Sequence, residues 1–329
     1  NNMAWKNLKQ RSLGDALLID HEALQELDGV HELIDWSRLE QLLINIHSST
    51  RGEKAWPPLM MLKALLLQSW YKLSDPALEK QLARDLLFRR FVGLDITESI
   101  PDHSTFWRFR QQLERRALME PLLQEINDQL IEQGLYIKSG GVSIVDASVI
   151  EAKQCRPNKT KSGDSTQDPD ADWNVKRGSD GKRKSTYGFK AHLSVDEDGL
   201  IKATDFTSGS VHDSNCFTDL LAGDESAVYA DSAYQSQKHA DWLSQQGIGN
   251  RVTKRAYRNR PLTAEDRLFN RIHSGVRSTV ERVFGVLKLH YGMAKARYLG
   301  IKRNRTRFQL MCVAHNIKRG RSIQRSSCA

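Results

Sequence analysis

The chain has 329 residues, four cysteines and a formal net charge of +9, from 49 Lys and Arg against 40 Asp and Glu. This length allows one large domain or two ordinary ones, and the cysteines form no C-x-x-C pair, which argues against a disulfide framework and a zinc site. No segment reaches the ~18 uninterrupted apolar residues of a membrane helix, so we expect no membrane association.

The first part of the chain, residues 3 to about 137, has the pattern of a helical domain. It opens with NNMAWKNLKQ, which lacks the regions of a signal peptide, so we expect a cytoplasmic protein. The run PPLMMLKALLLQSW is apolar almost all round and predicts a helix buried in a bundle. Ser74 caps the next predicted helix, on which Leu78, Leu82 and Leu86 share one face.

A further helix is predicted from Asp102 or Ser104 through the segment STFWRFRQQLERR. Its two phenylalanines and Leu113 face inward, which leaves Arg108, Gln111, Gln112 and Arg115 exposed. A capped helix, a turn and a second helix of this kind are typical of a helix-turn-helix DNA reader, although any amphipathic helix pair has a similar pattern. On the helix-turn-helix interpretation, we expect Arg108 and Arg110 to contact DNA.

The pattern changes from helix to strand at Gly140. The run GGVSIVDASVIEA predicts a strand, and the polar residues 153–186 predict a loop. FKAHLSVD and IKATDFTSG, around the turn EDGL, predict a hairpin. A helix near His212 precedes a fourth strand, AVYAD, and a second helix ends at Gly247. Strands that alternate with helices in this way predict an α/β layer.

The last part of the chain is strongly basic. Residues 251–329 hold 20 of the 49 Lys and Arg but only three acids, for a charge of +17, whereas the first 250 residues carry −8. Phosphate backbone is the natural counter-charge for such a surface, and a solvated basic tail is the alternative. Within this part, an amphipathic helix is predicted over residues 264–289.

Three acids fall where a metal site could form. Asp146 lies in the first predicted strand and Asp231 ends the fourth, so both carboxylates project at one sheet edge if these strands are neighbours. Glu281 is the only acid in the 63 residues from Arg267 onward. Each acid also has an ordinary interpretation, because Asp is common in turns and Glu281 is a suitable ion-pair partner for Arg277.

Other polar residues have two interpretations each. His212 and Asp213 fit either a role beside a metal ligand or the cap of the following helix, and we favour the cap. Lys190 and His192 alternate with apolar neighbours and either reach DNA or face solvent.

These residues carry a resemblance to a known family. VDAS at Asp146, YADSAY at Asp231, and the R-x3-E-x6-K pattern of Arg277, Glu281 and Lys288 resemble the DDE transposases of bacterial insertion sequences, nearest to insertion sequence family five. PDHSTFWRFR, DPDADW, TYGFKAH and VHDS also resemble that family, so the likeness covers about residues 50 to 317. Ser274 departs from the pattern, which has a tyrosine there. This departure concerns the DNA contact that the tyrosine of the family makes, and it does not concern the metal site.

The resemblance implies a fold and a chemistry. It implies an RNase H-like core, a mixed sheet flanked by helices, in which Asp146, Asp231 and Glu281 are catalytic and hold two Mg²⁺ ions that Mn²⁺ can replace. Two such ions, about 4 Å apart, activate the attacking oxygen and stabilise the leaving one at a phosphodiester. Water then nicks the element's end, and the freed 3′-hydroxyl joins target DNA. Arg277 and Lys288 suit phosphate positioning.

We therefore expect a transposase that acts on double-stranded DNA, as a nucleoid-associated homodimer. The expected domains are a helical end-recognition domain at 1–138, the catalytic core at 139–295, and a basic C-terminal helix and tail at 296–329. A related nuclease or domesticated transposase that cuts without joining is the alternative. A DNA-binding regulator is a weaker one, since it leaves the placement of the three acids unexplained.

Overall fold

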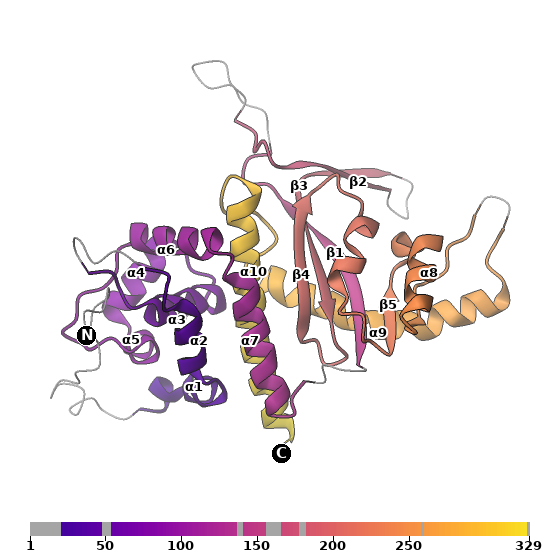
Figure 1. Cartoon of the computed structure of the whole chain (residues 1–329). Helices are drawn as coiled ribbons and strands as arrows, with labels where there is room; N and C mark the ends of the chain where they lie inside the picture. Colours follow the sequence, from indigo (N-terminus) through magenta and orange to yellow (C-terminus); the bar gives the residue numbers. More distant parts are fainter. Residues whose placement is uncertain are drawn as a thin grey trace. The chain divides into compact units, whose positions relative to one another are not determined.

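The computed structural model describes residues 21–47, 54–136, 141–155, 166–177, 182–257 and 260–327. The chain divides into two compact units, one of residues 1–135 with 309–329 and one of residues 136–308. Figure 1 shows the helices of the first unit and the sheet of the second. No helix in the described ranges combines the length and apolar character needed to cross a bilayer.

The first unit is helical, as predicted. Its long helix α3 is buried at every residue except Leu59, which fits its uniformly apolar sequence. Two long-range bonds join the unit's part of α10 to other helices: Trp70 Nε1 donates to Ala314 O at 2.8 Å, and Asn316 Nδ2 donates to Asn127 Oδ1 at 2.7 Å. The elements are η2 (Glu22–Gln25), α1 (Asp28–Leu33), α2 (Trp36–Leu43), α3 (Pro58–Trp70), α4 (Asp75–Arg84), α5 (Leu86–Val92), α6 (His103–Arg115) and α7 (Met119–Glu132).

The helix that begins at Ser74 is shorter than predicted. Ser74 caps α4 and accepts a bond from Ala77 N at 3.2 Å, as expected. However, Asp85 ends α4 and caps α5 by accepting a bond from Phe88 N, because a short carboxylate competes for backbone N–H groups. Leu86 therefore begins α5 and is 38% exposed, so its predicted place on the face of Leu78 and Leu82 is wrong.

The second unit is built on a mixed sheet, as the sequence predicted. The strand order is β2-β3-β1-β5-β6, and β4 pairs with β3 outside this path. β1 and β5 are parallel neighbours, with Val145 opposite Ala230. Asp146 and Asp231 directly follow these two partners, so the register brings the two acids to adjacent positions. The strands are β1 (Val142–Glu151), β2 (Asp172–Arg177), β3 (Arg183–Val195), β4 (Ile201–Ser208), β5 (Ala227–Ala230) and β6 (Gly249–Asn250).

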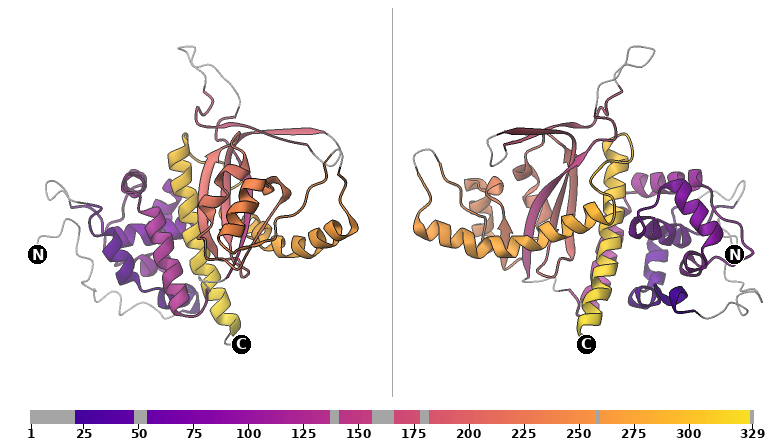
Figure 2. Two further views of the ribbon diagram at one scale, coloured as in Figure 1. Left: turned by 45° about the vertical axis from the view of Figure 1, so that its right-hand side comes forward. Right: turned by 180° about the vertical axis from the view of Figure 1, so that it is seen from behind.

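Helices cover both faces of the sheet. α9 (Ala264–Leu289) contacts β1, β3 and β5, and the right-hand view of Figure 2 shows it running across one face. α8 (Gln237–Gln245) lies on the other face with the short turns η3 (Asp213–Cys216), η4 (Thr218–Leu220) and η5 (Ser232–Tyr234). The apolar side chains of this second layer, including Phe217 and Leu243, pack on Val145 and Val228.

Two expectations for this unit are corrected. Residues 153–186, predicted as a loop, contain β2 and the start of β3, so AVYAD forms the fifth strand rather than the fourth. Residues 156–165 and 178–181 of that segment lie outside the described residues. The helix expected near His212 is a pair of 3₁₀ turns, η3 and η4.

The basic C-terminal segment is a structural helix. α10 (Ile301–Ser327) includes buried Met311, Val313, Ala314 and Ile317, so it is not a solvated tail. The boundary between the two compact units falls inside this helix, after Phe308. Compact units do not define functional domains, so the predicted domain limits stay a prediction.

Candidate active site

The site is anchored by two neighbouring strand positions. Asp146 lies within β1, and Asp231 directly follows β5. Asp231 also caps η5 by accepting a bond from Ala233 N, so the turn role considered for it is real. The cap uses Oδ1, whereas Oδ2 faces Arg277. One carboxylate therefore serves both the turn and the site.

α9 brings the third acid to the same place. A capping box between Thr263 and Asp266 starts the helix, and buried Val280, Val283, Phe284 and Leu287 seat it against the sheet. Arg277 and Glu281, one turn apart, then reach the edge where Asp146 and Asp231 lie.

Arg277 is the centre of the constellation. Its Nη2 lies 4.0 Å from Asp146 Oδ2, 4.0 Å from Asp231 Oδ2 and 3.8 Å from Glu281 Oε1. These separations are too long for hydrogen bonds, and Arg277 Nε is buried with no hydrogen-bond partner among the described residues. The guanidinium screens three acids without being closely bound to any of them.

The electrostatics of the site are clearest at Asp146. Burial raises the pKa of Asp146 to about 6, against the lowering effects of the Ala147 N–H and Arg277, while Asp231 raises it further. Ionised Asp146 is therefore costly, and a nearby cation would reduce that cost. Glu281 differs, since its side chain is 62% exposed.

The donor chemistry fits a divalent metal ion. Three carboxylates, two of them on adjacent parallel strands, are the hard oxygen ligands that such ions prefer, and the raised pKa of Asp146 shows a need for positive charge. As the side chains lie, no group of three or more His, Cys, Asp or Glu within the described ranges is close enough to hold a metal ion. Arg277 supplies the positive charge instead.

Two other residues singled out in the sequence, Lys288 and Ser274, also lie on α9. Lys288 is half-buried, and burial lowers its pKa, with Lys176 as the next cause, whereas Asp146 acts in the opposite direction. Ser274, which stands where the transposase pattern has tyrosine, donates its hydroxyl to Arg271 O in its own helix at 3.0 Å.

The predicted DNA contact Lys190 is buried instead. Its Nζ pairs with Asp213 Oδ1 at 2.8 Å and donates to Val211 O at 2.7 Å, so it is committed inside the core. His192 is also fully buried, with Nε2 2.8 Å from Thr207 Oγ1. His212 accepts a bond from Ser214 N, which confirms the expected cap, while Asp213 serves Lys190.

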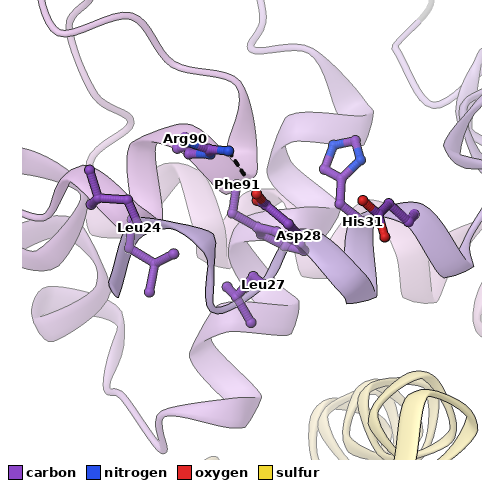
Figure 3. A pocket seen from close by; sticks show the side chains of 8 residues that line it. Leu24, Leu27, Asp28, His31, Arg90 and Phe91 are labelled. Carbon is purple, nitrogen blue, oxygen red and sulfur yellow. Dashed lines mark hydrogen bonds and ion pairs between the residues drawn. The ribbon is translucent and has the colours of Figure 1, made fainter. Parts of the chain in front are cut away.

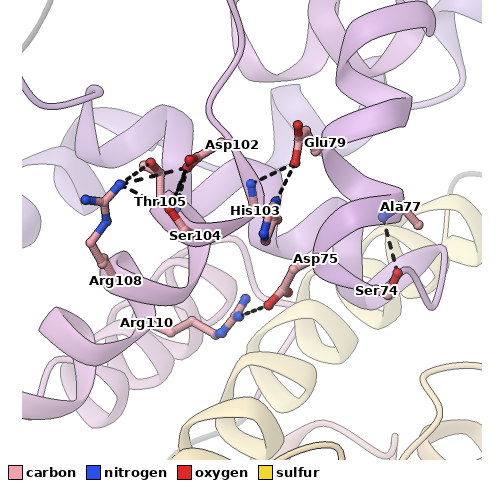
Figure 4. Close-up of polar contacts among 10 residues, drawn as sticks. All are labelled: Ser74, Asp75, Ala77, Glu79, Asp102, His103, Ser104, Thr105, Arg108 and Arg110. Atoms are coloured by element: carbon pink, nitrogen blue, oxygen red, sulfur yellow. Dashed lines mark hydrogen bonds and ion pairs between the residues drawn. The ribbon is translucent and has the colours of Figure 1, made fainter.

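The two predicted arginines of α6 differ from each other, as Figure 4 shows. Asp102 caps α6 by accepting a bond from Thr105 N at 2.7 Å. Arg108 is 64% exposed and donates to Thr105 Oγ1 at 3.0 Å. Arg110 is buried and binds Asp75 and Gln68, so in this arrangement its guanidinium is not available to phosphate.

Sequence reasoning missed two residues near the acids. Lys176 on β2 is exposed and acts on the pKa of both Asp146 and Lys288. Tyr234 is buried beneath Asp231, and its hydroxyl has no hydrogen-bond partner in the part of the chain that the structure describes. The spacing of Asp231 and Tyr234 in DSAY was the one available signal for the tyrosine. The polar composition around Lys176 concealed its strand.

A pocket of about 280 Å³ lies in the helical unit, apart from any predicted site residue. Figure 3 shows Leu24, Leu27, His31 and Phe91 around it and the ion pair of Arg90 with Asp28 at its rim.

Comparison with known families matches both units. The family described as "Transposase DDE domain" matches residues 138–317, more than half of the chain, and this range holds Asp146, Asp231 and Glu281. The family described as "Transposase domain (DUF772)" matches residues 15–112.

Among solved structures, the cryo-EM structure of the piggyBac transposase synaptic complex with hairpin DNA is 12% identical, with 97% of this chain and 82% of that chain covered and a TM-score of 0.35. A pre-cleavage Mos1 transpososome is 10% identical, with 94% and 98% covered and a TM-score of 0.20. Likenesses of this size carry no structural argument.

Proposed function

The chain belongs to the family of transposases with a DDE domain, and on that premise we propose that it acts on the terminal inverted repeats of an insertion sequence. It hydrolyses the element's ends with the help of Mg²⁺ and joins the freed 3′-hydroxyl to target DNA. We also propose that it works as a homodimer. Placement in insertion sequence family five stays a prediction.

The observation that carries this proposal is the position of Arg277 within 4.0 Å of Asp146 and Asp231 and within 3.8 Å of Glu281. An ordinary surface Glu281 that paired only with its own helix would not share its arginine with two strand-end carboxylates. The convergence of these acids from β1, the end of β5 and α9 supports a shared metal-binding role.

The three acids have distinct tasks in this proposal. Asp146 and Asp231 are fixed by the register of β1 and β5 and hold the metal, while Glu281, on the exposed side of α9, completes the ligand set. When bound, Mg²⁺ supplies Lewis-acid activation of the attacking oxygen and stabilisation of the leaving one. Mn²⁺ is the expected replacement.

Arg277 has a second task once metal is present. With Mg²⁺ held by the carboxylates, the guanidinium of Arg277 would be free to bind a substrate phosphate, for which its planar donor array is suited. Its contacts of 3.8–4.0 Å support such an exchange, since no short hydrogen bond to the acids has to be broken. Arg108, exposed on α6, is the proposed DNA contact of the helical unit.

The test is a cleavage and joining assay. The DNA that flanks the coding region is inspected for inverted repeats, and labelled duplexes with these ends are incubated with protein, Mg²⁺ and a target plasmid. We expect end-specific nicks and joined products. Nicks without joining would support the alternative of a related nuclease. Metal-independent or absent cleavage, with the repeats bound, would contradict the proposed function.

A further inference from the structure

A two-stranded ribbon leaves the sheet beside the acids. It consists of β2, residues 172–177, paired with residues 183–188 of β3. The other neighbours of β3 start later, β1 at Gly188 and β4 at Phe189. Figures 1 and 2 show the ribbon extending beyond the body of the sheet. A two-stranded segment is only marginally stable in water, so this ribbon benefits from a partner.

The two faces of the ribbon differ in chemistry. Trp173 and Val175 point to one face and are 49% and 56% exposed. Asn174 points to the other, where its amide donates to Gly209 O at 3.3 Å. Side chains alternate along a strand, so Lys176 shares the face of Asn174.

The face of Asn174 carries two like charges. The register places Lys176 directly opposite Lys184, and both side chains are exposed. Like charges in a directly opposed pair are destabilising. Neither lysine has an acidic partner within the described ranges, and Arg183, next to Lys184, is exposed on the opposite face. An anion bound between the strands would relieve this repulsion.

The ribbon lies within electrostatic reach of the catalytic acids. After burial, Lys176 is the main cause that lowers the pKa of Lys288. Lys176 also lowers the pKa of Asp146. Burial, the Ala147 N–H, Arg277 and Asp231 have larger effects on that pKa. The geometry connects the two places, because β3 pairs with Asp146 at Leu193 and with Lys176 at Lys184. An anion held at the ribbon therefore lies on the strand that borders Asp146.

We propose that the ribbon binds the phosphate backbone of DNA next to the catalytic acids, with Lys176 and Lys184 on either side of the strand. This inference rests on the proposed function. DNA is favoured over an acidic protein surface because two exposed and directly opposed lysines lie on a ribbon that leaves the strand next to Asp146. Their contact is with phosphate, so it is independent of base sequence.

The experiment compares two charge-matched double variants, Lys176→Gln with Lys184→Gln, and Lys238→Gln with Lys302→Gln. The control lysines are exposed on α8 and α10 of the same unit. Affinity for a duplex of arbitrary sequence is measured in EDTA over a range of salt concentrations. Because each phosphate contact contributes about −0.9 to the slope of log K against log salt, we expect the ribbon variant to lose about 2 from the slope. The control is expected to lose much less.

Equal slopes for the ribbon variant and the wild-type protein would overturn the proposal, and so would equal losses in the two variants. Sedimentation provides a separate readout. If the ribbon variant changed the oligomeric state but not the slope, the ribbon would be a protein interface and the proposal would be wrong. The assay needs neither metal nor cleavage, so a failure of the proposed catalytic function would leave its outcome readable.

Discussion

The helical unit and the proposed catalytic edge, where Asp146, Asp231 and Glu281 lie around Arg277, both place an arginine beside carboxylates, but they do so differently. In the helical unit, Arg110 binds Asp75 and Gln68, and Arg89 donates to backbone carbonyls. At the catalytic edge, Arg277 stays 3.8–4.0 Å from three acids, and its Nε has no hydrogen-bond partner within the described ranges. Buried charges closed by short bonds serve packing. Loosely matched charges remain available for exchange, which a metal-dependent site requires.

The largest expected effect comes from the acids of the catalytic edge. Asp231→Asn keeps the cap of η5, because Asn caps as well as Asp, but removes the charge that holds metal. We expect a folded protein that binds DNA without nicking or joining it. The control is Asp35→Asn in the helical unit. Like Asp231, Asp35 caps a helix by accepting a hydrogen bond from the backbone N–H two residues later, in this case Ser37 N.

Wild-type cleavage by Asp231→Asn would return that residue to a turn role. Asp146→Asn and Glu281→Gln are expected to be as inactive as Asp231→Asn. Their losses should not add in double variants, because removal of one ligand already disables the shared site.

The second effect tests the packing role of Arg110. Arg110→Gln leaves Asp75 without its cation at a site where the two side chains are only 6% and 15% exposed. Breaking a buried pair in this way costs about 3–5 kcal/mol, so we expect a clear loss of thermal stability in the helical unit. Metal affinity is expected to stay unchanged. A stable variant with weakened DNA binding would instead restore Arg110 as a DNA contact.

The third effect tests whether Arg277 and metal compete for the same acids. Arg277→Gln removes a positive charge close to three carboxylates, so Mn²⁺ should bind roughly tenfold more tightly, or about 1.4 kcal/mol. The metal-free variant should melt at a lower temperature, because Asp146 and Asp231 then repel each other unscreened. Cleavage should nevertheless fall if the guanidinium positions phosphate.

Mn²⁺ titration followed by electron paramagnetic resonance measures this affinity without any DNA. The matched control is Arg282→Gln on the same helix, whose Nη2 donates to Thr279 Oγ1 at 3.1 Å. Weaker Mn²⁺ binding by Arg277→Gln than by this control would show that the arginine supports the site rather than competing with metal.

The sequence predicted the parts of the fold that local rules decide. Ser74, Asp102 and His212 are caps, as their residue types and spacing indicated. The sequence left open whether the strands of Asp146 and Asp231 are neighbours, and the structure shows that β1 and β5 are parallel neighbours. For each cap, the signal lies within a few residues of the position that it explains.

Other features depend on partners distant in the chain. Arg110 can be buried because it forms an ion pair with Asp75 of α4. Lys190 can be buried because it forms an ion pair with Asp213. Nothing beside either cation in the sequence indicates such a partner. The sequence predicts a loop at β2 because its charged composition outweighs the alternation of Trp173, Asn174 and Val175. The tertiary pairing of β3 overrides that local preference.

The smallest expected effect concerns pH and Asp146. Burial first raises its pKa to about 6 from an ordinary value of 3.8, so the metal-free folded protein binds more protons than the unfolded chain between these values. The stabilisation from protonated Asp146 is therefore fully present below about pH 4 and is lost as pH rises to 6. A full shift of two units would amount to about 3 kcal/mol. We expect about 1–2 kcal/mol, because the side chain is 22% exposed.

Denaturant unfolding of wild-type protein and Asp146→Asn in EDTA, from pH 4 to 7, isolates this contribution. Asp196, whose pKa burial also raises to about 6, contributes equally to both proteins and cancels in the difference. Saturating Mg²⁺ should remove this loss, since a bound cation lowers the pKa of the carboxyl below its ordinary value of 3.8. Stability then rises with pH only up to about that value and is level above it, so the sign is reversed at the acidic end of the range. No such effect of Mg²⁺ is expected in the helical unit, because its buried Arg89 and Arg110 already form hydrogen bonds with protein groups. A pH profile of the difference that is identical with and without Mg²⁺ would remove Asp146 from the ligand set, and with it the distinction between the two regions.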